Sequence, residues 1–242
     1  MSDPRDYVCL ALDLDTEKEI FRCVDELSDY VGFFKLNAAF TLFGPRLISE
    51  LLARGCKIFL DLKLHDIPNT VGLYAEAVTR LGVHIVTIHA AGGVEMMKQA
   101  TTAAESTAKV VGKNRPKFVG VTLLTSIDQA IMNQELGIPG TIQGEVTRKA
   151  ELAIQAGLDG IVCAASDLTY LKPNLPNGFL CVTPGLRFTA AESDDHRRTQ
   201  SHTEAIAVGS NLLVVGRSIL SANNRRDAAR RLLSEIAEVM LT

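Results

Sequence analysis

Hydrophobic residues along the chain form eight short apolar runs, and most runs are followed by a segment in which apolar residues recur at helical spacing. Continuous apolar runs of this length are typical of strands buried on both faces of a parallel sheet. The runs lie at residues 7–12, 31–36, 57–62, 84–89, 117–123, 160–163, 180–183 and 212–215. Helices are expected at about 16–27, 45–53, 70–81, 93–107 and 127–156, the last interrupted by Gly137-Ile-Pro-Gly140.

This alternation of strands and helices predicts an α/β fold with a parallel sheet. Eight such units in 242 residues favour a closed (β/α)8 TIM barrel over an open doubly wound sheet, and residues 1–242 are expected to form a single domain. A Gly-x-Gly-x-x-Gly sequence does not follow the first run, which weighs against a dinucleotide site.

Polar residues follow the apolar runs at the points where the strands should end. In a barrel of this kind the carboxyl ends of the strands form the functional face. The side chains expected to converge there are Asp13, Lys35, Asp61, Lys63, Asp66, His89, Thr125, Arg187 and Arg217.

The segment 57–70, KIFLDLKLHDIPNT, carries the densest group of these charges. Residues two apart in a strand share a face, so Asp61 and Lys63 should lie side by side. A second carboxylate, Asp66, follows in the expected loop before Pro68, where the next helix should start. The group could be a structural ion pair at a strand end, or a catalytic array in which two acids bracket one ammonium.

Two segments near the C-terminus favour a phosphate site after strands 7 and 8. In the first, Val215-Gly-Arg217, a glycine and a cation stand at a strand-to-helix junction, where backbone N–H groups and a guanidinium can bind an anion. In the second, Thr183-Pro-Gly-Leu-Arg187 precedes the polar stretch 188–203, which we interpret as a lid.

Composition places the chain among ordinary globular proteins, with 47% hydrophobic and 22% charged residues. The net charge of −3 does not suggest a nucleic-acid partner, and the sequence lacks a signal peptide or membrane segment, so we expect a cytoplasmic protein without a membrane partner. The five cysteines are widely spaced and should be buried thiols. Spacing of His65, His84 and His89 does not indicate a metal site, and no cofactor is expected; His84 and His89 should pack in the core or at strand ends.

Several motifs, taken together, resemble the orotidine 5'-phosphate decarboxylases, and the resemblance extends over essentially the whole chain. The motifs are Ala-Leu-Asp13, the strand with Lys35, DLKLHDIPNT at 61–70, Val-Thr-Leu-Leu-Thr125-Ser, TPGLR at 183–187 and VGRSI at 215–219. The resemblance implies a homodimeric enzyme of pyrimidine biosynthesis that converts orotidine 5'-phosphate to uridine 5'-phosphate and CO2 without a metal.

The resemblance also implies roles for individual residues. Lys63 would protonate C6 of the pyrimidine within an Asp61, Lys63 and Asp66 charge array, and Asp66, Ile67 and Thr70 would reach the neighbouring subunit's site. Asp13 and Lys35 would hold the ribose, Thr125 would contact the pyrimidine, and Arg187, Gly216 and Arg217 would bind phosphate.

One position departs from the family pattern. His196 stands in the lid where bacterial members usually carry a glutamine, whose amide would bridge phosphate and base. A histidine can donate a hydrogen bond to phosphate but lacks the adjacent donor and acceptor of an amide.

The residue pattern is also compatible with three other functions. A keto-sugar-phosphate decarboxylase or hexulose-phosphate synthase relative would use the same barrel and Asp-x-Lys-x-x-Asp strand with Mg2+, although IPNT and TPGxR are not expected in it. Lys63 could instead form a Schiff base in an aldolase. A phosphate-binding protein without catalysis is the alternative from another class.

Overall fold

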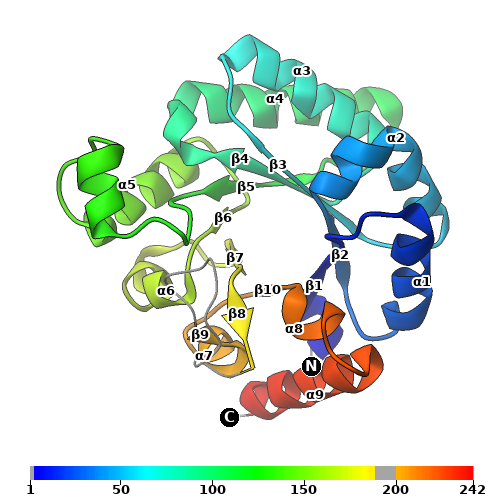
Figure 1. Cartoon of the computed structure of the whole chain (residues 1–242). Helices are drawn as coiled ribbons and strands as arrows, with labels where there is room; N and C mark the ends of the chain where they lie inside the picture. The colour runs from blue at the N-terminus through cyan, green and yellow to red at the C-terminus, as the bar shows by residue number, and fades with distance from the viewer. Residues whose placement is uncertain (1–2, 189–199, 242) are drawn as a thin grey trace.

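The computed structural model describes residues 3–188 and 200–241. Its centre is a closed barrel of eight parallel strands in the order β1-β10-β7-β6-β5-β4-β3-β2. The strands are β1 (Val8–Ala11), β2 (Phe33–Leu36), β3 (Ile58–Leu64), β4 (Ile85–His89), β5 (Lys117–Val121), β6 (Gly160–Val162), β7 (Leu180–Thr183) and β10 (Leu212–Val215). Figure 1 looks down this barrel, with the helices arranged outside the strands. The predicted (β/α)8 TIM barrel is therefore confirmed.

The helices that cover the barrel are α1 (Glu17–Leu27), α2 (Ala38–Ala53), α3 (Pro68–Leu81), α4 (Gly93–Val111), α5 (Ile142–Gln155), α6 (Ala165–Leu171), α7 (His202–Ala207), α8 (Arg217–Leu220) and α9 (Arg225–Met240). Three short 3-10 helices are η1 (Pro4–Tyr7), η2 (Ala90–Gly92) and η4 (Lys172–Asn174), and η3 (Ile131–Glu135) is a short π-helix. A separate two-stranded sheet joins β8 (Leu186–Arg187) to β9 (Gln200–Ser201). Within the described residues, no helix has the length and apolar character needed to span a bilayer.

Local signals in the sequence account for several helix ends. The Thr16 side chain accepts a hydrogen bond from the Glu19 N–H and caps α1 as expected. Pro68 occupies the first turn of α3, and Gly82 ends that helix in a left-handed conformation, with φ 85°. Pro68 thus marks the start of the helix that follows β3, and Gly82 its end before β4.

Some boundaries differ from the sequence-based expectation. The helix expected from residue 45 begins at Ala38, because two helical segments join across a kink at Gly44, with φ 65°. The third strand extends to Leu64 rather than residue 62, through an irregular pairing with β4. The fifth strand ends at Val121 rather than residue 123. Helices α6, α7, α8 and α9 were not predicted individually. The last of them, α9, packs against α1 and η1.

The core has two parts. Inside the barrel, a small cluster contains Cys9, Phe59, Ile85, Val119, Val182 and Leu212, all buried. A larger cluster fills the space between the strands and the helices. All five cysteines are buried free thiols, as predicted.

Gly160 allows β6 and β7 to approach each other closely. A Cβ atom at this position would lie 2.2 Å from the Leu180 carbonyl oxygen, which cannot move without disturbing the strand. We therefore expect Gly160→Ala to lower the free energy of unfolding by about 1–3 kcal/mol, measured by urea denaturation.

Gly144→Ala is the matched control for this substitution. Its added Cβ would lie 3.3 Å from the Thr141 hydroxyl, inside helix α5, where alanine is favoured over glycine. This variant should be as stable as the native chain or slightly more so. Equal loss of stability in both variants would contradict the close-approach argument.

Candidate active site

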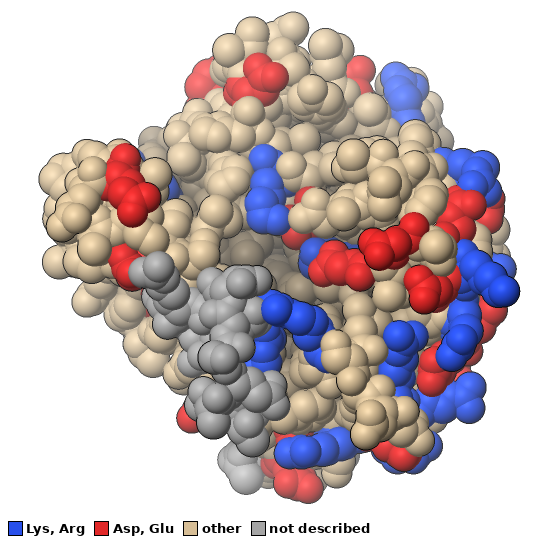
Figure 2. Space-filling view, viewed as in Figure 1, with Lys and Arg blue, Asp and Glu red and all other residues tan. Residues whose placement is uncertain are grey.

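A cavity of about 410 Å³ opens at the carboxyl ends of the strands. Of the residues predicted to converge there, the ones that line it are Asp13, Lys35, Asp61, Lys63, Thr125, Arg187 and Arg217, and the predicted phosphate ligand Gly216 lines it as well. Figure 2 shows this face, with Lys and Arg side chains around a central hollow. The cavity therefore brings together most of the residues identified in the sequence, from six different strands or the loops after them.

At the base of this cavity, Asp61 lies between two lysines. The Lys63 Nζ is 2.9 Å from each carboxylate oxygen of Asp61. The Lys35 Nζ is 3.3 Å from Asp61 Oδ2, and the side chains of Lys35 and Asp61 are each 10% exposed. Lys63 is more open, at 34% exposed. One carboxylate thus holds two ammonium groups, of which Lys63 faces solvent more.

The electrostatic environment keeps Asp61 ionised. Burial alone would raise the pKa of this carboxyl, but the charges of Lys35 and Lys63 and hydrogen bonds from Lys63 and Thr87 outweigh burial. The pKa of Asp61 is therefore lower than its usual value. At neutral pH the base of the cavity holds a carboxylate flanked by two cations.

The backbone at Lys63 is unusual. Among the described residues other than glycine, Lys63 alone has a positive φ, 49°. Such a conformation costs about 1–3 kcal/mol and persists where surrounding contacts enforce it. Here the Lys63 N–H donates to Thr87 Oγ1 at 2.8 Å, at the irregular pairing between β3 and β4.

Thr87 links the backbone of Lys63 to the carboxylate of Asp61. Its hydroxyl accepts from the Lys63 N–H and donates to Asp61 Oδ1, also at 2.8 Å. Thr87 was not predicted as a site residue, although a hydroxyl within the apolar run 84–89 was the available signal. Asn37 and Ser126 also line the cavity and were missed.

The opposite side of the cavity carries the two predicted arginines. Gly216 and Arg217 follow β10, and Arg217 is the first residue of α8. Gly185, with φ 76°, lets the chain turn before β8, where Arg187 is buried and its Nη1 donates to the Leu186 carbonyl at 2.7 Å. Cations therefore lie on the side of the cavity formed after strands β7 and β10.

A model of the "Orotidine 5'-phosphate decarboxylase / HUMPS family" matches residues 6–232. The chain belongs to this family.

Individual members of the family resemble the chain over nearly its whole length. A protein of Heliobacterium modesticaldum named orotidine 5'-phosphate decarboxylase is 38% identical over 237 residues, covering 98% of each chain. One of the same name from Vibrio cholerae is 43% identical over 223 residues, covering 92% of this chain and 94% of its own. A crystal structure of orotidine 5'-phosphate decarboxylase from Lactobacillus acidophilus has a TM-score of 0.83 at 34% identity, covering 95% and 98%.

Some residues expected from the family resemblance lie outside the lining of the cavity. Asp66, Ile67 and Thr70 stand at the start of α3, where Asp66 Oδ1 accepts from the Ile67 N–H at 2.7 Å and Ile67 is 66% exposed. His196 lies outside the described residues.

His89 was expected at the mouth but also lies outside the cavity lining. Its ring is 5.3 Å from that of His65, and burial, followed by the charges of His65 and Lys63, lowers the pKa of His89 to about 4. His89 is therefore a neutral side chain at the end of β4, in line with the expected packing role.

Thr87→Val tests the link between Lys63 and Asp61. Valine keeps the shape but removes the hydroxyl that pairs with both residues, and we expect the free energy of unfolding to fall by about 1–3 kcal/mol. Thr87→Ser should retain most of the stability, because it keeps the hydroxyl. Urea denaturation measures both.

Thr107→Val is the control, since Thr107 is also buried but its hydroxyl makes no hydrogen bond within the described residues. This variant should change stability little. Equal losses for Thr87→Val and Thr107→Val would show that the bridging hydroxyl contributes nothing specific.

Proposed function

We propose that this chain, acting as a single domain, decarboxylates orotidine 5'-phosphate to uridine 5'-phosphate and CO2 in pyrimidine biosynthesis. The observation that carries the proposal is the buried Asp61 between Lys35 and Lys63, at one side of a cavity that has Arg187 and Arg217 at the other. A substrate with a carboxylate at one end and a phosphate at the other matches this distribution of charge. The names of the full-length relatives support the same reaction.

Lys63 is the residue that we assign to the chemical step. Loss of CO2 from C6 leaves an electron pair on a ring carbon, and an adjacent ammonium stabilises that charge more than it stabilises the starting substrate. The same ammonium then donates its proton to C6. The exposure of Lys63 to the cavity supports this role, because the group must reach the substrate.

Asp61 would act on the same centre, and the other lining residues would hold the rest of the nucleoside. Asp61 fixes the position of the Lys63 ammonium and, next to the substrate carboxylate, disfavours the ground state. Lys35 and Asp13 are assigned to the ribose hydroxyls, and Thr125 to the pyrimidine. Their positions in the cavity lining support these assignments.

The phosphate would bind at the other side of the cavity. Arg187, Gly216 and Arg217 are the assigned ligands, by charge and, at Gly216, by backbone N–H. Interactions with this remote group can position the reacting carbon and so increase the rate of the chemical step. We include His196 as a phosphate ligand from the sequence alone, and its role remains a prediction, as does a cytoplasmic location.

We further propose a homodimer in which Asp66, Ile67 and Thr70 complete the partner's site. These residues lie at the start of α3, where exposed apolar side chains continue along the helix, with Ile67 66%, Leu73 59% and Tyr74 46% exposed. An exposed apolar helix face supports an interface with a second copy.

The second candidate is an Mg2+-dependent keto-sugar-phosphate decarboxylase or hexulose-phosphate synthase, because the name of the matching family includes HUMPS. The deciding assay mixes the purified chain with orotidine 5'-phosphate and a chelator and follows ultraviolet absorbance. We expect rapid loss of substrate with uridine 5'-phosphate as product. Turnover of a keto-sugar phosphate only when Mg2+ is restored would support the second candidate instead.

Lys63→Ala tests the catalytic assignment. We expect kcat/KM to fall more than about a thousandfold, because the variant lacks both the stabilising charge and the proton donor. Lys98→Ala, which removes an exposed lysine on α4, should keep native turnover. Near-native decarboxylation by Lys63→Ala would remove this residue from the mechanism.

Mixing two inactive variants tests the shared site. Homodimers of Lys63→Ala and of Asp66→Asn should each be inactive, but subunit exchange creates one site with both native residues. At equal concentrations we expect activity to recover to about a quarter of the native value, since half the dimers are mixed and each has one intact site. No recovery after demonstrated exchange would contradict the assignment of Asp66 to the partner's site.

A further inference from the structure

A second cavity lies at the opposite end of the barrel, where the strands begin. Its volume is about 880 Å³. It is formed by the first residues of strands and by the loops that precede them, among them Phe33, Lys57, His84, Lys117 and Asn211. The family resemblance and the catalytic proposal assign nothing to this cavity.

Positive charge is concentrated on its walls. The lining contains Lys57, Lys113, Arg115 and Lys117, whereas Asp6 is the one carboxylate among the described residues that line it. This local excess occurs in a chain whose net charge is −3. A cavity lined mainly by cations attracts anions from solution.

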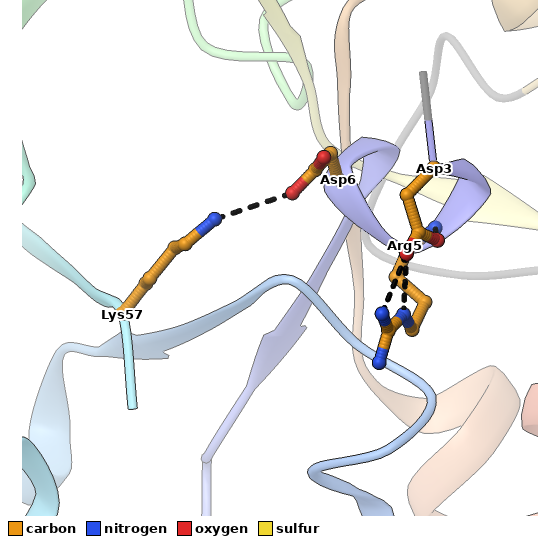
Figure 3. Close-up of polar contacts among 4 residues, drawn as sticks. All are labelled: Asp3, Arg5, Asp6 and Lys57. Carbon is orange, nitrogen blue, oxygen red and sulfur yellow. Dashed lines mark hydrogen bonds and ion pairs between the residues drawn. The ribbon is translucent and has the colours of Figure 1, made fainter. Parts of the chain in front are cut away.

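Two of these cations already have carboxylate partners. The Lys57 Nζ lies 3.2 Å from Asp6 Oδ1, and Figure 3 shows Lys57 reaching across to Asp6 while Arg5 pairs with Asp3. Arg115 forms two hydrogen bonds with Asp159, at 2.9 and 2.6 Å. These pairs fix the two side chains, whereas Lys113 and Lys117 have no carboxylate partner in the described part of the chain.

Lys113 and Lys117 provide the excess charge. The Lys113 Nζ donates to the carbonyl oxygen of Arg80 at 2.6 Å, which is a neutral acceptor at the end of α3. Lys117 is exposed and has no ion-pair partner within the described residues. The position of Lys113 can be explained by its hydrogen bond to the C-terminal end of α3. The Lys117 side chain makes no such contact with another described residue, yet Lys117 lines the same cavity.

Neutral groups on the walls could also bind an anion. The His84 Nδ1 accepts from the Ile58 N–H at 3.1 Å, so a neutral His84 carries its proton on Nε2 and can donate from there. Asn211 Oδ1 accepts from the Cys181 N–H at 2.9 Å, which orients the amide and leaves its NH2 as a donor. Hydrogen-bond donors thus accompany the lysines.

The apolar core separates this cavity from the catalytic one. Phe59 and Val182 line the catalytic cavity, whereas Ile85 and Leu212 line the second cavity, and all four belong to the cluster inside the barrel. A ligand in the second cavity would therefore not touch the catalytic groups. Binding there can be measured separately from turnover.

We propose that the cavity at the amino ends of the strands binds a small polyanion with several phosphate groups. Lys113 and Lys117 bind the phosphates, and donors from His84 and Asn211 complete the site. Phe33, with the His84 ring 6.5 Å away edge-on, offers an apolar wall. The ligand can be free inorganic polyphosphate or the phosphate chain of a nucleotide, since both present the same chemistry.

Isothermal titration calorimetry with inorganic tripolyphosphate, and separately with ATP, tests this site on the whole chain. Lys117→Glu should weaken binding by about tenfold or more at low salt, because it replaces an attractive charge with a repulsive one. It should fold normally, since Lys117 is exposed, and should keep native turnover. Tighter binding of ATP would identify a nucleotide as the favoured source, and tighter binding of tripolyphosphate would identify the inorganic ion.

Two controls separate this site from the catalytic cavity. Lys98→Glu, an equal change of charge on the outer face of α4, should bind both ligands as the native chain does. Arg217→Ala should also keep binding if the ligand occupies the second cavity. Absence of binding by the native chain, equal weakening by Lys98→Glu and Lys117→Glu, or loss of binding in Arg217→Ala alone would overturn the proposal, without bearing on the decarboxylase assignment.

Discussion

The interaction on which the catalytic cavity depends is the pairing of one buried carboxylate with two ammonium groups. Asp61 is nearly removed from water, and a charge in that position is costly unless cations and hydrogen-bond donors surround it. The barrel provides these from neighbouring strands, Lys35 from β2 and Thr87 from β4. The pairing of β3 with β2 on one side and with β4 on the other therefore supplies the groups that keep Asp61 ionised, and Asp61 in turn holds the Lys63 ammonium.

The strained backbone of Lys63 lies within the same arrangement. The positive φ of Lys63 occurs where the pairing of β3 with β4 is irregular, and the Thr87 hydroxyl holds both the Lys63 N–H and Asp61. Folding energy from the surrounding barrel thus maintains a conformation that a free peptide would rarely adopt.

Much of this fold could be predicted because it depends on patterns local in the sequence. Each barrel strand is an apolar run, and Thr16, Pro68 and Gly82 mark helix ends by known chemistry. At Gly44 the Gly44-Pro45 pair was a local signal for the kink, but it did not indicate that α2 begins before it, at Ala38. The backbone at Lys63 could not be predicted, because the hydrogen bond that accompanies it comes from Thr87 in another strand. Thr87 was missed for a related reason. Its role depends on hydrogen bonds to residues of the neighbouring strand, and the sequence does not show which residues lie opposite it.

The charges that line the catalytic cavity indicate the kind of ligand that it can bind. The catalytic cavity is lined by four cations, Lys35, Lys63, Arg187 and Arg217, and by two carboxylates, Asp13 and Asp61. This excess of positive charge suits a substrate that bears both a carboxylate and a phosphate. The remaining carboxylate of the sequence motif, Asp66, lies outside the cavity beside the exposed Ile67. This position of Asp66, outside its own cavity and beside an exposed apolar side chain, agrees with the proposed dimer, in which Asp66 would add a carboxylate to the partner's site.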